Sequence, residues 1–218
     1  MNTVCTQGSN TLDILFSDDT LVVSNKPSGL LSVPGRGPDK QDCMVARVQA
    51  RFSDALTVHR LDMETSGILL FARGAAMQRA LSVAFQERQT EKRYVALVDG
   101  ELAQPEGEID LPLIADWPNR PRQMVDYTLG KASLTRYRVE HIDPLRKISR
   151  VALAPVTGRS HQLRVHLMSI GHAILGDALY ASEAVRARAP RLMLHACKLE
   201  FRHPLSAEWL SFESPAPF

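Results

Sequence analysis

The stretch His59-Arg60-Leu61-Asp62-Met63-Glu64-Thr65-Ser66-Gly67-Ile68-Leu69-Leu70 places a charged loop directly before an apolar run. The run 68–72 predicts a short buried strand, because a continuous apolar stretch of this length suits a strand better than a helix. Asp62 then lies on the loop that enters a core strand, where a rigid scaffold presents loop side chains to a cleft. A neighbouring arginine and turn N–H groups can keep its carboxylate ionised, as a nucleophile requires. The ordinary alternative is a turn-forming aspartate.

Three further segments help to decide between these two interpretations of Asp62. Residues 25–31 read NKPSGLL and follow the predicted strand 21–23; residues 92–98 read KRYVALV; residues 155–166 read PVTGRSHQLRVH. In this order, and with HRLDMETSGILL, they resemble the RluA family of pseudouridine synthases. The resemblance extends over roughly residues 12–218. It includes DWPNRP at 116–121, HAILGD at 172–177 and RLMLHA at 191–196.

The resemblance implies a fold and an activity. The expected fold is α+β: one catalytic domain at 12–218, with a mixed, mostly antiparallel central sheet flanked by helices and a cleft across its middle. The expected reaction is site-specific isomerisation of uridine to pseudouridine in structured RNA, after the base has been flipped out of its stack. The most similar members act on a 23S ribosomal RNA hairpin loop and on the anticodon stem-loop of certain tRNAs.

The resemblance also assigns roles to three catalytic residues. Asp62 matches the aspartate that starts glycosidic cleavage, and the motif is equally compatible with attack on the base, attack on the sugar carbon or assistance to elimination. Arg164 matches the arginine that pairs with this aspartate and would keep it ionised and oriented. Tyr94 matches the tyrosine that stacks on the flipped base, and its phenol is a candidate for removing the C5 proton. Taken alone, HQLR and KRY would indicate a solvated arginine and a half-buried strand tyrosine.

Further residues are expected to bind RNA. Arg60 matches the residue that fills the space left by the flipped base, with a phosphate contact or a surface ion pair as the alternative. His59, Arg159 and His161 are expected to hold loops or contact RNA, and Trp117 and Arg120 to contact RNA. Leu163 and Leu199 are expected to form apolar walls near the uracil. Trp117 could stack on a base or pack under its loop, and ordinary core is the alternative for both leucines. No redox step or external nucleophile is required, so neither cofactor nor metal is expected.

Composition agrees with an RNA-modifying enzyme without specifying one. The net charge is only +2, but 20 of the 26 basic residues are Arg, whose fork suits phosphate; codon bias is the alternative. Three cysteines without pairing logic favour a reducing cytoplasm. No signal peptide and no apolar run of about 20 residues is present. A monomer is expected, with a flexible segment at 1–11 and no N-terminal accessory RNA-binding domain.

The chain pattern predicts the secondary structure. Helices are expected at 44–52 (capped by Asp42), 75–87 and 161–169. Strands are expected as a pair within 14–24, at 92–98, 134–142, 149–154, 192–201 and 208–212, with an extended segment at 109–114, a turn at 104–107 and a loop at 117–123. Strands outnumber helices and the two do not alternate regularly, which favours the α+β class.

Three other interpretations compete with this one. A metallohydrolase would use His161, His166, His172 and His195, but residues five apart on a helix are separated by roughly 140°, and no acidic or cysteine partner completes the set. A glycosidase-like pair, Asp62 and Glu64, would put two carboxylates on one strand face, whereas such pairs come from distant segments. A non-catalytic RNA-binding module on the same fold would require loss of the catalytic residues, and all three are present.

Overall fold

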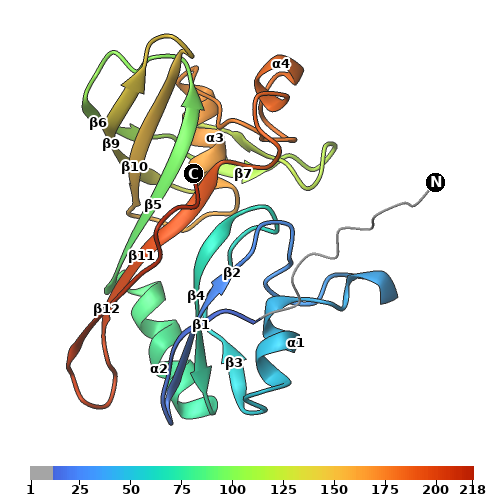
Figure 1. Ribbon diagram of the computed structural model, residues 1–218, viewed down its shortest axis with the longest axis vertical. Coiled ribbons are helices and arrows are strands. Elements are labelled where there is room, and N and C mark those ends of the chain that lie inside the picture. The colour runs from blue at the N-terminus through green and yellow to red at the C-terminus, as the bar shows by residue number, and fades with distance from the viewer. Residues whose placement is uncertain (1–11) are drawn as a thin grey trace.

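The computed structural model describes residues 12–218, and its largest element is a ten-stranded sheet (Figure 1). The strands are β1 Ile14–Ser17, β2 Leu21–Lys26, β3 Ala55–Thr57, β4 Ser66–Arg73, β5 Thr90–Asp99, β6 Glu106–Asp110, β7 Leu113–Ala115, β8 Gln123–Val125, β9 Leu134–Asp143, β10 Ile148–Pro155, β11 Leu194–Arg202 and β12 Trp209–Glu213. The helices are α1 Met44–Gln49, α2 Ala75–Gln86, α3 Gln162–Ser169 and α4 Glu183–Arg186, with a 3-10 turn at Pro38–Lys40.

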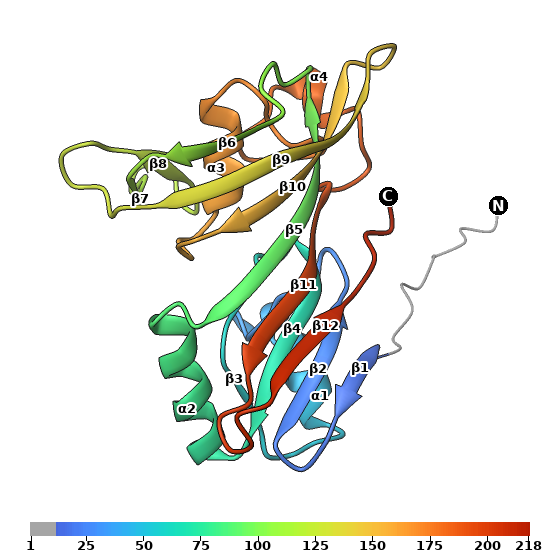
Figure 2. The ribbon, with the colours of Figure 1, turned by 90° about the vertical axis from the view of Figure 1, so that its left-hand side faces the viewer.

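The main sheet has the order β1-β2-β4-β11-β5-β10-β9-β6, with β12 paired to β11 and β3 to β4. Its pairings are antiparallel except that of β11 with β4. Figure 2 shows β1, β2, β4 and β12 in one half of the molecule and β6, β9 and β10 in the other, with β5 and β11 running between them. β7 and β8 form a separate two-stranded sheet. The α+β class with a mixed, mostly antiparallel sheet is confirmed.

Strand β4 is the buried strand that the sequence predicts. Leu69 and Phe71 belong to the cluster that contains the buried residues of α1, whereas Ile68, Leu70 and Ala72 belong to the cluster that contains those of α2. A strand buried on both faces has a continuous apolar run rather than an alternating one, which explains the GILLFA pattern.

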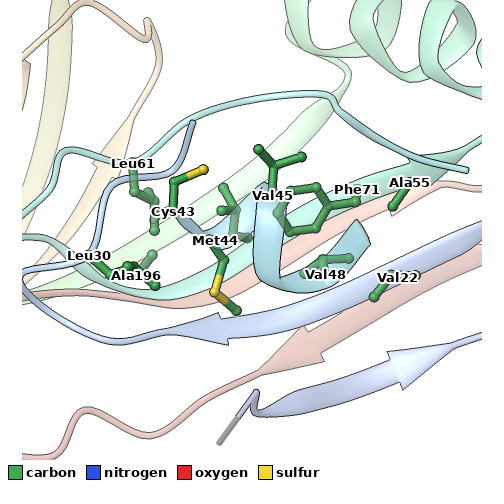
Figure 3. Close-up of a cluster of buried hydrophobic side chains, with 11 residues drawn as sticks. Val22, Leu30, Cys43, Met44, Val45, Val48, Ala55, Leu61, Phe71 and Ala196 are labelled. Carbon is green, nitrogen blue, oxygen red and sulfur yellow. The ribbon is translucent and has the colours of Figure 1, made fainter. Parts of the chain in front are cut away.

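The cluster against α1 extends to the loop before β4. Figure 3 shows Leu30, Leu61 and Ala196 packed at the same end of this cluster. Leu61 is only 8% exposed although it immediately precedes Asp62. Burial of this leucine ties the backbone of the loop to the hydrophobic core.

Several expected elements are corrected by the structure. Helix α1 ends at Gln49, before Phe52, and its N-cap is Cys43; Asp42 does not cap it but pairs with Arg47 at 2.7 Å. β6 begins at Glu106, where a turn was expected, because this segment pairs with β9. The short elements β3, β8 and α4 were not predicted. The expectation of a flexible segment at residues 1–11 lies outside the described residues.

Candidate active site

Asp62 lies on the loop between β3 and β4, and the NKPSGLL segment packs against this loop and bonds to its backbone. Lys26 is completely buried, and its ammonium group donates to the carbonyl oxygens of Pro27, Leu30 and Met63 at 2.7–2.9 Å. Three carbonyl acceptors use all three protons of the ammonium group. Lys26 therefore fixes the loop beside Asp62 and does not reach a phosphate.

A close approach between two strands fixes the other end of the loop. Gly67 has a φ of +115°, and a Cβ atom at this position would collide with the backbone of Ala196. This is the point where β4 runs parallel to β11, with Gly67 opposite Ala196. The glycine of the TSG turn is therefore required by packing as well as by backbone conformation.

The opposite wall is the turn that leads into α3. The side-chain oxygen of Gln162 accepts hydrogen bonds from the Thr157 hydroxyl at 2.7 Å and the Arg159 N–H at 3.0 Å. Its amide nitrogen donates to the carbonyl of Leu134 and the hydroxyl of Thr135, both at 3.0 Å. This buried amide uses its full hydrogen-bonding capacity to hold the TGR turn against β9.

Arg164 of α3 lies between two carboxylates. It forms a bidentate pair with Asp177 at 2.7 and 2.8 Å, and its Nη1 lies 3.5 Å from Oδ2 of Asp62. Burial opposes the charge of Arg164, but the hydrogen bonds and charge of Asp177, with a smaller contribution from Asp62, raise its pKa. His161 Nε2 lies 3.9 Å from Oδ1 of Asp62.

Tyr94 faces the same space from β5 and is half-buried. Burial raises the pKa of its phenol, and the negative charge of Asp62 adds to this effect. The hydroxyl therefore keeps its proton at neutral pH, so Tyr94 offers an aromatic face and a hydrogen-bond donor. A protonated phenol cannot take a proton from C5 unless it first loses its own.

These residues surround a cavity of about 110 Å³. Seven of the eleven predicted site residues line it: Asp62, Tyr94, Arg164, Arg60, Arg159, His161 and Leu163. It opens into a groove of about 1270 Å³, whose lining also contains His59 and Arg120. The groove carries additional basic side chains, namely Arg36, Lys40, Arg88 and Lys92.

The structure corrects the placement of Leu199. It lies in the cluster with α2 and does not line the cavity. Leu194 supplies the apolar wall instead, together with Leu163.

The structure also shows which of their expected contacts His59 and Trp117 make. Nε2 of His59 accepts the N–H of Leu70 at 3.0 Å, and its ring stacks on Phe85, so the side chain holds the loop. Burial lowers the pKa of His59 to about 3, which keeps the ring neutral. Trp117 is 65% exposed and does not pack under its loop; Arg120 lies over its ring, with Cζ 3.1 Å from the centroid.

Two residues near the site were missed as functional candidates. Asp177 holds Arg164, and Tyr180 contacts His161 through its hydroxyl at 2.6 Å. Asp177 ends the HAILGD segment and Tyr180 follows it. Gly176 of this segment has a φ of +75° and lies so close to the Arg191 carbonyl that a side chain would collide with it. This glycine in front of an aspartate is the signal that could have pointed to Asp177.

Two of the competing interpretations, the metallohydrolase and the glycosidase-like pair, find no support in the geometry. Across residues 12–218, no three His, Cys, Asp or Glu side chains gather into a possible metal site. His166, His172 and His195 instead bond to the carbonyl oxygens of Leu111, Asp99 and Ser214. Met63 and Glu64 form a turn rather than a strand, and Asp62 lines the small cavity without Glu64.

Comparison with known proteins identifies the class to which this fold and site belong. Residues 20–169 match the family model described as RNA pseudouridylate synthase. The chain therefore belongs to the RNA pseudouridylate synthase family and is an isomerase that modifies RNA. It is 51% identical, over 95% of its length and 94% of the relative, to the dual-specificity RNA pseudouridine synthase RluA of Pasteurella multocida. The RluA of Escherichia coli strain K12 is 50% identical over the same shares.

Solved structures agree with this membership. Human RNA pseudouridylate synthase domain containing 1 superposes with a TM-score of 0.81 at 30% identity, over 98% of this chain and 87% of that one. Human RNA pseudouridylate synthase domain containing 4 gives a TM-score of 0.76 at 27% identity, over 94% and 88% of the two chains. Within residues 12–218, no helix has the length and apolar character needed to cross a membrane.

Proposed function

We propose that the protein isomerises uridine to pseudouridine in RNA stem-loops and that Asp62 starts the cleavage of the N1–C1′ bond. The observation that carries this proposal is the position of the Asp62 carboxylate in a small cavity beside Tyr94 and 3.5 Å from the guanidinium group of Arg164. The cavity provides an aromatic face for the base, a carboxylate and a fixed positive charge. These are the groups that glycosidic cleavage at a flipped uridine requires.

The reaction is a rearrangement within one nucleotide. The bond between N1 and C1′ breaks, the uracil turns in the cavity, C5 bonds to C1′, and the proton on C5 is lost as N1 gains one. Tyr94 holds the ring by stacking, and Leu163 and Leu194 limit its movement. Arg60, which is exposed at the rim of the cavity, fills the space that the base leaves in the RNA stack.

We propose that both ribosomal RNA and tRNA are substrates: a 23S ribosomal RNA loop and a tRNA anticodon stem-loop. The relatives about 50% identical to this chain are named dual-specificity enzymes. The wide groove with its basic rim suits recognition of RNA by shape and backbone, with an unstacked loop nucleotide in the cavity. Trp117 and Arg120 lie on the loop beside this groove and are positioned to contact the RNA. We propose that the protein works as a cytoplasmic monomer.

The experiment that tests the reaction compares Asp62→Asn with Glu64→Gln, two residues along the same loop. We expect Asp62→Asn to abolish pseudouridine formation on a stem-loop RNA while RNA binding and thermal stability persist. Glu64→Gln should keep its turnover at saturating RNA, since its carboxylate lines the wide groove rather than the small cavity. Normal turnover by Asp62→Asn would remove Asp62 from its role, and an inactive wild-type enzyme that still binds RNA would favour a non-catalytic binding module.

The substrates are tested separately, by mapping pseudouridine in total RNA from cells with and without the protein. Loss of signal in both a 23S ribosomal RNA loop and a tRNA anticodon stem-loop is the expected result. Loss at another site would keep the reaction and overturn the substrate assignment. Sedimentation of the purified protein, alone and with a stem-loop RNA, tests the monomeric state.

A further inference from the structure

Tyr180 connects the loop that carries Trp117 and Arg120 to the surroundings of the Asp62 carboxylate. Its side chain is only 7% exposed. Its hydroxyl accepts a hydrogen bond from the N–H of Gln123, the first residue of β8, at 2.7 Å, and lies 2.6 Å from Nδ1 of His161. The other ring nitrogen of His161 faces Asp62. One phenol therefore contacts both the end of this loop and the imidazole beside the reactive group.

The hydrogen bonds around Tyr180 determine where its proton lies. A phenol has one proton to donate and accepts through its oxygen. The N–H of Gln123 already donates to that oxygen, and within residues 12–218 only Nδ1 of His161 is placed to accept the phenolic proton. Nδ1 therefore acts as the acceptor in this pair.

The state of His161 follows from this assignment. Burial lowers the pKa of His161 against the opposing charge of Asp62, and the charge of Arg164 lowers it further, which favours the neutral ring that an accepting Nδ1 requires. A neutral imidazole carries one proton, and the hydrogen bond at one nitrogen decides which nitrogen holds it. With Nδ1 accepting from Tyr180, the proton lies on Nε2, which faces Oδ1 of Asp62 at 3.9 Å.

We propose that Tyr180 is a positioning residue: it selects the His161 tautomer that presents an N–H, rather than a lone pair, to the Asp62 carboxylate. The inference rests on the proposed role of Asp62. At 3.9 Å the imidazole N–H acts through its dipole rather than through a direct hydrogen bond. It attracts the carboxylate from one side while Arg164 attracts it from the other, and together they orient it toward the cavity. The opposite tautomer would direct a lone pair at the carboxylate and leave the Tyr180 proton without an acceptor.

The test uses Tyr180→Phe, which removes the hydroxyl and keeps the ring that Arg164 contacts. Tyr127→Phe is the matched control, because Tyr127 is 78% exposed. The whole protein is labelled with 15N-histidine, the His161 signals are assigned by their loss in His161→Gln, and the two ring nitrogens are distinguished by their chemical shifts. Single-turnover rates and RNA dissociation constants are measured on one stem-loop RNA.

We expect His161 to carry its proton on Nε2 in the wild type and in Tyr127→Phe, and to shift toward the Nδ1-protonated form in Tyr180→Phe. At saturating RNA, the single-turnover rate of Tyr180→Phe should fall roughly tenfold, about the effect of one buried hydrogen bond. A proton on Nδ1 in the wild type, or an unchanged His161 spectrum in Tyr180→Phe, would overturn the inference. An inactive wild type would instead overturn the proposed function, while the spectra would still decide the tautomer.

Discussion

Replacing Asp177 with Asn removes one charge from a pair that is almost completely shielded from water. The side chains of Arg164 and Asp177 are 4% and 1% exposed, and two hydrogen bonds of 2.7 and 2.8 Å join them. Asn has nearly the same shape but replaces one acceptor oxygen with an NH₂ group, which then faces an N–H donor. The guanidinium group keeps its charge and loses the partner that compensates for its burial.

The expected loss of stability can be worked from this geometry. Breaking a buried ion pair by removing one partner costs about 3–5 kcal/mol. Asn still provides one acceptor, so we expect the lower end, about 3 kcal/mol. For a chain of this size each kcal/mol lowers the melting temperature by about 2–4 °C, which gives a decrease of roughly 6–12 °C.

The measurement is urea and thermal unfolding of Asp177→Asn beside Asp42→Asn. Asp42 forms a similarly short pair with Arg47, but its side chain is 64% exposed, and exposed pairs contribute only about 0–1 kcal/mol. If the two variants lost the same free energy of unfolding, the buried pair would not be what holds Arg164 in place.

Three further outcomes are expected. Gly67→Ala should cost about 2–6 kcal/mol in unfolding free energy, through backbone strain and overpacking; Gly171→Ala, with positive φ but open space around it, should show the strain alone. His59→Gln should flatten the pH dependence of the unfolding free energy. The pKa of His59 is about 3 in the folded protein, so between pH 3 and 6.5 the unfolded chain binds more protons than the folded one. The unfolding free energy of the wild type should therefore fall by up to about 1.36 kcal/mol for each unit of decreasing pH, which urea unfolding at pH 4–7 measures. A pH dependence unchanged in the variant would refute this. Tyr94→Ala should weaken RNA binding by about 1–3 kcal/mol through lost stacking, whereas Tyr94→Phe should bind RNA as the wild type does in a filter assay. If Tyr94→Ala bound RNA as tightly as the wild type, stacking on Tyr94 would be excluded.

The sequence was most informative where a local pattern determines the structure. Helix α3 was expected at 161–169 and spans Gln162–Ser169; α2 was expected at 75–87 and spans Ala75–Gln86. The continuous apolar run of β4 correctly indicated a buried strand. β3 was missed because its three residues, Ala55–Thr57, are too few to show a period, and it forms through pairing with β4.

The sequence indicated the residues proposed to react with the RNA but not the residues that hold them in place. Motif resemblance named Asp62, Tyr94 and Arg164, and the fold brings all three to one cavity. An aspartate in a loop has the same local signature whether it caps a turn or binds an arginine thirteen residues earlier, so Asp177 received no role. The contact of Tyr180 with Gln123 joins residues 57 apart, which no local pattern can reveal.

The two carboxylates beside Arg164 differ in a way that fits a structural role for Asp177 and the reactive role proposed for Asp62. Asp177 accepts the guanidinium fork and, in addition, two backbone N–H groups, from Leu179 and Tyr180. Its oxygens are committed, since charge-assisted bonds of this length are the strongest that a carboxylate forms. Asp62 has only a 3.5 Å contact with Arg164 and a 3.9 Å contact with His161. Because Asp177 occupies the fork, Arg164 reaches Asp62 only through one long contact of 3.5 Å, which leaves most of the Asp62 lone pairs available to a uridine in the cavity.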